Sequence, residues 1–263
     1  MTADEIILEK EDGIATITLN RPQKLNSITL GMAERMVRML EELNEDDETK
    51  VLILTGAGRA FCSGVDISGP VFPTETIRTV RLDPFPWITR LFLRLYQMDK
   101  PTIAAINGIV SGSGFGLALG CDIRISAEDA RFSMIFVKRG LIAGCGSCYL
   151  LPRIVGLSKA FELMWTGDWF DAKEAEEIEL VSRVVPQEDL MPVTKELARK
   201  IAKGPSIAIE LMKRLVRKGL ESSDFAAYMV QEGWAQNFCL ETEDGKEGIK
   251  AFLEKREPIF RGK

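Results

Sequence analysis

The uncharged stretch Pro101–Cys121 constrains the fold of this chain more than any other segment. It is 21 residues long, enough to span a membrane as a helix, but five of its residues are glycines. Because glycine is a poor helix former, we interpret the wider segment Ala104–Ser126 (AAINGIVSGSGFGLALGCDIRIS) as a buried strand, a glycine-rich turn, a helix and another strand. Ala60–Ile67 (AFCSGVDI) likewise has an apolar run that breaks at a Gly/Ser turn.

This pattern of strand, turn and helix has a chemical consequence. The first N–H groups of a helix have no partner within the helix and carry partial positive charge. Two such turns that face one another can hold a developing oxyanion between two backbone donors. The pattern therefore predicts a site whose central groups belong to the main chain.

Composition excludes several classes of protein. The chain has 263 residues, is 46% hydrophobic and carries a net charge of −5 without a basic cluster, so neither nucleic acid nor membrane is an expected partner. The charged N-terminal residues do not resemble a signal peptide, and five cysteines in apolar surroundings favour a reducing, cytoplasmic location. Because histidine is absent, Ser–His–Asp and Cys–His machinery and an HExxH zinc site are excluded, and we expect no metal site.

The hydrophobic pattern predicts an α/β protein that becomes mostly helical after Pro152. Two strands in Ile6–Leu19 flank an Asp12-Gly13 turn, and alternating strands and helices imply a largely parallel sheet. The other predicted strands are Val51–Leu54, Ile103–Ile106 and Ile123–Ile125. The predicted helices are Leu30–Leu43, Ile88–Met98, Ser158–Trp165, one that begins near Asp171 with a capping box to Glu174, Leu190–Ala202, Ser206–Gly219, Asp224–Cys239 and Gly245–Lys255.

Several motifs in one order resemble the enoyl-CoA hydratase/isomerase family, the crotonases. They are NRPQKLNSI (Asn20–Ile28), KVLILTGAGRAFCSGVDI (Lys50–Ile67), INGIVSGSGFGLALGCDIRIS (Ile106–Ser126), ARFSMIFVKRGLIAGCGSCYLLPRIVG (Ala130–Gly156) and EGIKAFLEKREPIFRGK (Glu247–Lys263). The resemblance implies a crotonase-type α/β core of ββα units over residues 1–200, which binds acyl-CoA, and a C-terminal helical trimerisation region over residues 201–263. It also implies a homotrimer or a dimer of trimers. Coenzyme A would enter as part of the thioester substrate, not as a separate cofactor.

The resemblance assigns two backbone oxyanion donors, the N–H groups of Val65 and Ser113. Ser113 stands in the middle of Gly112-Ser113-Gly114, where the family usually has three glycines. Since the donor belongs to the main chain, serine can serve if the local backbone tolerates a Cβ.

The carboxylates that the resemblance leads one to expect are absent. Family hydratases carry two catalytic glutamates, and these positions fall on Gly116 and Phe136 here; an acid used by some family isomerases falls on Gly144. Hydration needs a base for water and an acid for the α-carbon, and the usual groups for both are missing. Phe136 and Phe115 instead predict a dry, apolar acyl pocket.

Other ionisable groups are weaker candidates for proton transfer. Asp66 and Asp83 are the nearest to the predicted pocket, although a structural role is the simpler reading for Asp66. We expect Asp122 to pair with a buried base such as Arg124 or Arg153. The remaining candidates are Cys62, Arg78, Arg81, Tyr96, Ser111, Ser113 and Tyr149.

The resemblance also implies which residues contact coenzyme A. Gln23, Lys24 and Leu25 match the loop that meets the adenine end, although Lys24 could equally be an ordinary solvated lysine. Phe252 and Lys255 resemble residues that cover the nucleotide, sometimes from a neighbouring subunit, although Phe252 could equally pack beside Ile249. Around the first turn, the positions matched to coenzyme A are Ala60, Cys62, Asp66 and Ile67.

Two further motifs are weak. Gly112-Ser113-Gly114-Phe115-Gly116 has G-x-G-x-G spacing, which differs from the dinucleotide-binding G-x-G-x-x-G. Cys145-Gly-Ser-Cys148 could be redox-active, but small residues are also what a tightly packed helix requires.

Together these observations predict an acyl-CoA-transforming enzyme that stabilises a thioester enolate. Isomerisation, decarboxylation or another reaction at the α-carbon is preferred because the hydratase glutamates are missing. The alternatives are a hydratase whose acid and base lie elsewhere and a non-catalytic acyl-CoA-binding member of the family.

Overall fold

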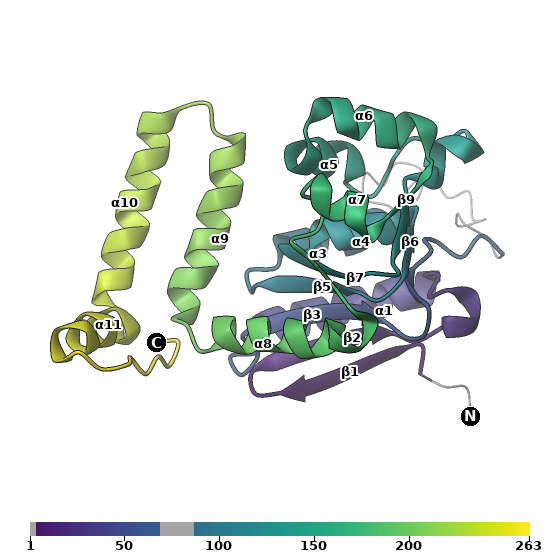
Figure 1. The fold of residues 1–263 in the computed structure, drawn as a ribbon. Helices are drawn as coiled ribbons and strands as arrows, with labels where there is room; N and C mark the ends of the chain where they lie inside the picture. The colour runs from purple at the N-terminus through teal and green to yellow at the C-terminus, as the bar shows by residue number, and fades with distance from the viewer. Residues whose placement is uncertain (1–3, 69–86) are drawn as a thin grey trace, which may run out of the picture.

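A six-stranded, mostly parallel sheet forms the centre of the molecule (Figure 1). The computed structural model describes residues 4–68 and 87–263. The strand order is β1-β2-β3-β5-β7-β10, and every neighbouring pair is parallel except the β1–β2 hairpin. The strands are β1 (Ile6–Glu11), β2 (Ile14–Leu19), β3 (Val51–Gly56), β5 (Thr102–Ile106), β7 (Ile123–Ala127) and β10 (Arg183–Val185). The predicted α/β class and parallel sheet are confirmed.

The β1–β2 hairpin turns at the predicted dipeptide. Asp12 and Gly13 both have positive φ, at 51° and 76°, as a two-residue hairpin turn that matches the twist of its strands requires. Register follows directly, with Glu11 opposite Ile14 and Ile6 opposite Leu19.

A second, four-stranded sheet carries the short strands. Its order is β4-β6-β8-β9, with β4–β6 and β6–β8 parallel and β8–β9 antiparallel. Its strands are β4 (Ala60–Cys62), β6 (Ile109–Ser111), β8 (Arg131–Ser133) and β9 (Trp169–Asp171). Each of β4, β6 and β8 follows a strand of the large sheet in the chain, as expected for ββα units. The parallel pairing brings the carboxyl ends of β4 and β6 to one edge.

The helices follow the predicted boundaries to within two residues wherever a range was predicted. Helix α1 begins after Thr29, whose hydroxyl accepts the Met32 N–H at 3.2 Å. Asp171 likewise caps α7 by accepting the Glu174 N–H at 2.9 Å, but the Glu174 carboxylate pairs with Lys159, so half of the predicted capping box forms. The helices are α1 (Leu30–Glu45), α3 (Trp87–Gln97), α4 (Ser113–Gly120), α5 (Ser147–Val155), α6 (Leu157–Thr166), α7 (Ala172–Glu177), α8 (Leu190–Ala202), α9 (Ser206–Glu221), α10 (Phe225–Glu241) and α11 (Glu243–Glu254).

Strand β3 shows why the sheet is buried on both faces. Leu52 and Leu54 belong to the large core cluster that includes side chains of α1 and α3. Val51 and Ile53 point to the other face and pack with residues of α8. A strand covered on both faces has a continuous apolar sequence, which is the signal that the chain shows here. Among the described residues, no helix is long and apolar enough to cross a membrane.

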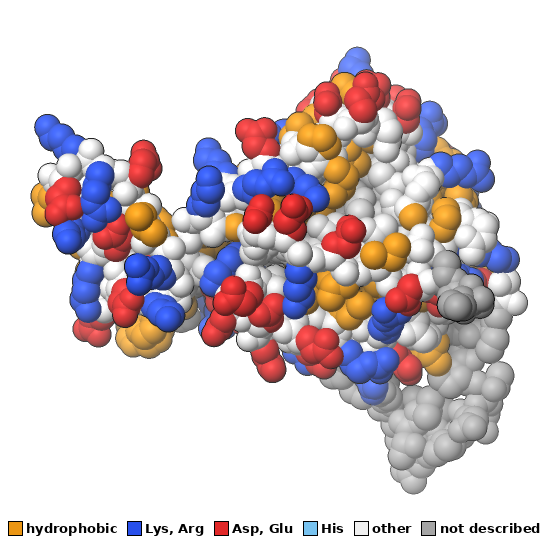
Figure 2. Space-filling view, turned by 90° about the horizontal axis from the view of Figure 1, so that it is seen from below, with side chains coloured by type: hydrophobic (Ala, Val, Ile, Leu, Met, Phe, Trp, Pro, Cys, Tyr) orange, Lys and Arg blue, Asp and Glu red, His pale blue; other side chains and the backbone are white. Residues whose placement is uncertain are grey.

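Helices α9, α10 and α11 form an arm that stands apart from the layered core (Figure 1). Figure 2, seen from below, shows the outer part of this arm as a separate lobe, with acidic and basic side chains interspersed over the visible face. The arm carries a row of exposed apolar residues on α9, namely Met212, Val216 and Leu220, at intervals of one helical turn.

Candidate active site

The two predicted glycine turns touch at the shared edge of β4 and β6. A Cβ built on Gly64 would lie 3.2 Å from the Ser113 nitrogen and 3.3 Å from the Ser111 oxygen. Gly64 and Gly112 have φ of +111° and +53°, so both positions require glycine's conformational freedom. The Ser111 hydroxyl donates to the Ser63 carbonyl at 3.0 Å and ties the turns together.

The Val65 N–H is left unpaired by the way its turn is held. Ile28 forms a parallel bridge with Val65, in which the Ile28 N–H donates to Gly64 O at 2.8 Å and the Asp66 N–H donates to Ile28 O at 2.9 Å. Ile28 thus bonds to the residues on either side of Val65, whose own N–H points away from it. Among the described residues, this N–H meets no acceptor.

The Ser113 N–H is unpaired for a different reason. Ser113 is the first residue of α4, and the first N–H groups of a helix have no acceptor within it. No acceptor for this N–H is found in the described part of the chain. The geometry therefore presents two free backbone donors on two turns in contact.

A cavity of about 670 Å³ adjoins α4. Four helices supply its walls, and its surface is mostly apolar and aromatic. Its lining residues are Thr89, Phe92, Leu93, Tyr96, Gly116, Gly120, Cys145, Gly146, Tyr149, Leu150, Arg153, Leu220 and Glu221. Tyr96 and Tyr149 thus reach the cavity, as predicted. Phe115 and Phe136 do not line it: Phe115 packs at 6.2 Å from both Phe132 and Phe170, and Phe136 packs against the core.

Gly116 is closed to any side chain. A Cβ there would lie 2.6 Å from Cys145 Cβ, 2.7 Å from Cys145 O and 3.0 Å from Phe92 Cε1. Cys145 therefore fills the space into which a glutamate at position 116 would extend. At Gly144, by contrast, an added Cβ would meet nothing within 4 Å.

Cys145 was not predicted as a neighbour of the oxyanion turns. Its thiol donates to the Ser113 hydroxyl, with Sγ 3.3 Å from Oγ. Burial raises the pKa of this thiol to about 11, so it is protonated at neutral pH. Cys148 donates separately to Ala143 O at 3.0 Å, and both thiols are free. The described residues hold no cluster of potential metal ligands.

Cys62 supports the first turn from within the core. Its sulfur accepts the Gly64 N–H at 3.4 Å, and burial raises the pKa of the thiol to about 12. Ala60 is equally buried, and its carbonyl accepts the Asn26 amide at 2.6 Å. The side chains of Ala60 and Cys62 therefore pack inside the protein.

Asp66 lies at the same turn but is engaged in ion pairing. Its carboxylate accepts from the Ser68 hydroxyl and N–H and pairs with Arg21 Nη2 at 2.9 Å. The hydrogen bonds from Ser68 contribute most, and together with the contacts to Arg21 they lower the pKa of Asp66 to about 2. Asp66 does not line the cavity. Its ion pair with Arg21 fixes the first turn to the loop that contains Arg21.

The loop predicted to meet coenzyme A lies beside this turn. Gln23 and Lys24 are exposed, and Leu25 O accepts the Ser63 N–H at 3.0 Å. Ile67, two residues after the bridged Val65, is 65% exposed. Phe252 and Lys255 lie on and after α11, at the outer end of the arm (Figure 1), so one chain does not bring them to this loop.

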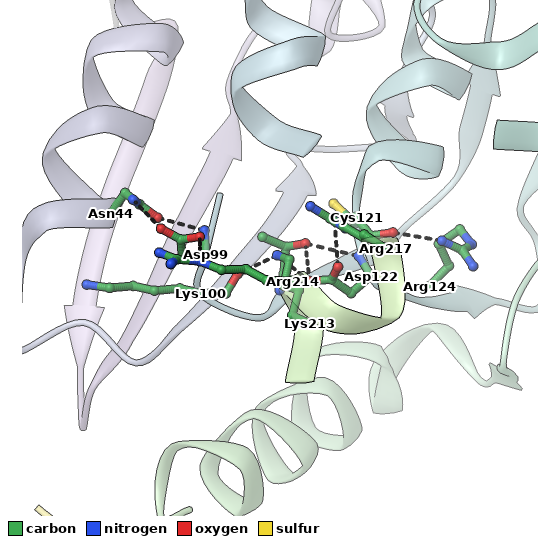
Figure 3. Close-up of polar contacts among 10 residues, drawn as sticks. Asn44, Asp99, Lys100, Cys121, Asp122, Arg124, Lys213, Arg214 and Arg217 are labelled. Atoms are coloured by element: carbon green, nitrogen blue, oxygen red, sulfur yellow. Dashed lines mark hydrogen bonds and ion pairs between the residues drawn. The ribbon is translucent and has the colours of Figure 1, made fainter. Parts of the chain in front are cut away.

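Asp122 pairs with largely buried bases, as predicted, but they are not the two residues that were named as examples. Its carboxylate pairs with Lys213 and Arg217 of α9, each at 2.7 Å (Figure 3), and not with Arg124 or Arg153. Arg124 instead donates to the carbonyls of Cys121 and Leu180. The partners of Asp122 lie about ninety residues further along the chain, where no local pattern could indicate them. Arg78, Arg81 and Asp83 lie outside the described residues.

Comparison with known proteins shows which family this chain belongs to. A family model described as enoyl-CoA hydratase/isomerase matches residues 9–263. The chain is 37% identical over 259 residues to the 1,2-epoxyphenylacetyl-CoA isomerase of Escherichia coli K12, with 98% of each chain covered. It is 36% identical over 258 residues to the short-chain-enoyl-CoA hydratase of Clostridium acetobutylicum, with 97% of each covered. The crystal structure of an enoyl-CoA hydratase from Bacillus anthracis superposes with a TM-score of 0.92 at 36% identity, covering 99% of this chain and 100% of that one.

Proposed function

We propose that this chain, which belongs to the enoyl-CoA hydratase/isomerase family, stabilises a thioester enolate between the N–H groups of Val65 and Ser113. The observation that carries the proposal is the pair of unpaired donors on touching turns, next to an apolar cavity. Two donors aimed at one oxygen stabilise the negative charge that develops there when an α-carbon bond breaks.

The surroundings of the turns favour reactions that do not activate water. Position 116 cannot hold a carboxylate beside Cys145, and the neutral Cys145 thiol is too weak a base to deprotonate water at neutral pH. A decarboxylation breaks a C–C bond whose electron pair becomes the enolate, so that step needs no base. A double-bond shift needs one group that takes a proton from one carbon and returns it to another, whereas hydration needs both a base for water and an acid for the α-carbon. Both reactions use the oxyanion donors and need fewer proton-transfer groups than hydration does. We therefore prefer isomerase, decarboxylase or other α-carbon chemistry.

The same proposal places coenzyme A on the loop of Gln23, Lys24 and Leu25, beside the turn that holds Val65. Phe252 and Lys255 would reach the nucleotide from a second copy of the chain, because α11 stands away from this loop. A homotrimer or a dimer of trimers fits this arrangement and would cover exposed apolar residues of the arm such as Val216. Native mass spectrometry that found a monomer would contradict it.

The test is product formation or α-proton exchange in deuterated water. The purified protein is incubated with enoyl-, malonyl- and aromatic acyl-CoA thioesters, and each is followed by mass spectrometry. New products or deuterium at the α-carbon support the proposal and name the acyl class. Binding without change or exchange would favour a non-catalytic acyl-CoA-binding protein, and hydration of an enoyl-CoA would show an acid and base elsewhere.

A matched pair of variants isolates the main-chain donor. Ser113→Pro removes the N–H at the first helical position, where proline is tolerated, whereas Ser113→Ala removes the hydroxyl alone. We expect Ser113→Pro to slow exchange by about 10²–10³-fold and Ser113→Ala to have a far smaller effect. Equal losses in the two variants, both shown to be folded by circular dichroism, would overturn the assignment of Ser113 N–H.

A further inference from the structure

Helix α9 is part of the arm, yet its last turn lines part of the cavity. Leu220 and Glu221 end α9 and line the cavity together with residues of α3, α4 and α5. The Tyr149 hydroxyl donates to Glu221 at 2.8 Å and joins α5 to this last turn. The size of the cavity therefore depends on how α9 is held against the core.

A half-buried carboxylate, that of Asp122 with a side chain 23% exposed, holds α9 in place. Asp122 Oδ2 accepts from the N–H and hydroxyl of Thr102, at 2.8 and 2.9 Å, which fixes the carboxylate to β5. The same carboxylate pairs with Lys213 and Arg217 on successive turns of α9 (Figure 3). The side chains of Lys213 and Arg217 are only 9% and 19% exposed, so this contact is screened by water far less than a surface ion pair.

Arg217 connects the carboxylate with the cavity. Its guanidinium lies over the ring of Tyr96, 4.1 Å from the ring centroid, and Tyr96 lines the cavity. Leu220 and Glu221 follow Arg217 by three and four residues, so they lie on the same side of α9. A shift of Arg217 would therefore move Tyr96 and the α9 residues of the cavity lining together.

We propose that Asp122 is a positioning residue that sets the depth of the acyl pocket through Lys213 and Arg217. The inference rests on the proposed function, because it takes the cavity to hold the acyl group. Without the negative charge, two neighbouring cations on α9 lose the counterion that they share. The last turn of α9 then moves away from the core, and the pocket accepts longer acyl groups.

A second anchor on the same helix provides the control. Asp99 pairs with Arg214 at 2.6 Å, but Arg214 is 59% exposed and neither residue lines the cavity. Asp99→Asn removes an α9 ion pair as Asp122→Asn does, without touching Arg217 or Tyr96. Any general effect of loosening α9 should appear in both variants.

The experiment measures the affinity for butyryl-CoA and dodecanoyl-CoA by titration calorimetry. We expect the ratio of the two dissociation constants to shift by about tenfold toward dodecanoyl-CoA in Asp122→Asn and to change little in Asp99→Asn. Arg217→Gln should reproduce the shift and serves as the test if Asp122→Asn does not fold. Hydrogen exchange over residues 217–221 should accelerate in the same variants.

The outcomes separate this inference from the proposed function. An unchanged ratio in folded Asp122→Asn and Arg217→Gln overturns the role of Asp122, and so does an equal shift in Asp99→Asn. If the unaltered protein binds neither thioester, the proposed function falls and this inference falls with it.

Discussion

The oxyanion turns and the wall of the cavity are built from different parts of the chain. The turns consist of main-chain atoms from Ser63–Val65 and Gly112–Gly114, packed so closely that a side chain on Gly114 would overlap the Cys62 carbonyl. The cavity is lined mostly by side chains of four helices. Gly144 directly precedes the lining residue Cys145, and an added Cβ there would meet no atom within 4 Å. The two turns therefore tolerate little change, whereas the loop at Gly144 has room for a side chain.

Substitutions at two glycines test this difference in packing most directly. Gly114→Ala should lower the free energy of unfolding by on the order of 4 kcal/mol, because the new Cβ overlaps backbone atoms that cannot move aside. Gly144→Ala should change it by less than about 0.5 kcal/mol, because no atom lies within 4 Å of the new Cβ. Urea unfolding measures both variants. Similar losses for the two would show that the turns are no more tightly packed than the loop at Gly144.

Gly116 and Cys145 lie at the boundary between the two regions. Gly116→Ala should cost about 2 kcal/mol through its contact with Cys145, and the cost should be smaller in a Cys145→Gly background. Glycine also suits the positive φ of 58° at position 145. A double-mutant cycle by urea unfolding should give a coupling free energy of about 1 kcal/mol between positions 116 and 145. The remaining cost of Gly116→Ala comes from contacts with the Cys145 carbonyl and Phe92. Strict additivity would show that Cys145 does not occupy the space at position 116.

The smallest expected effect concerns the ion pair that fixes the first turn. The pKa of Asp66 is lowered to about 2 in the folded protein, so its contribution is complete above about pH 4 and is lost as the pH falls toward 2. Asp66→Asn should be less stable than the unaltered protein by about 1 kcal/mol at pH 6, since the carboxylate is near the surface and partly screened. Urea unfolding from pH 6 to pH 2 should show the difference in free energy of unfolding between the two proteins shrinking. A difference that stays constant would assign the effect of the substitution to packing.

Much of the fold could be predicted because its signals are local. Helix α8 begins and ends at the predicted residues, Leu190 and Ala202, and the β1–β2 turn falls on Asp12-Gly13. The prediction failed where two distant segments meet. Asp122 pairs with α9 and not with Arg124, and Cys145 packs against Gly116 from the turn before α5. The residues at both contacts are ordinary in their own segments.

The sequence by itself determined most strands of the large sheet, most helices, the two glycine turns and the family, because periodicity, turn residues and motifs are local signals. The tertiary structure decided what surrounds those turns: the thiol in place of a carboxylate, the cavity and the part of its lining that α9 supplies. The physical reason is that packing and ion pairing depend on distances between segments far apart in the chain. Periodicity and turn chemistry do not specify those distances.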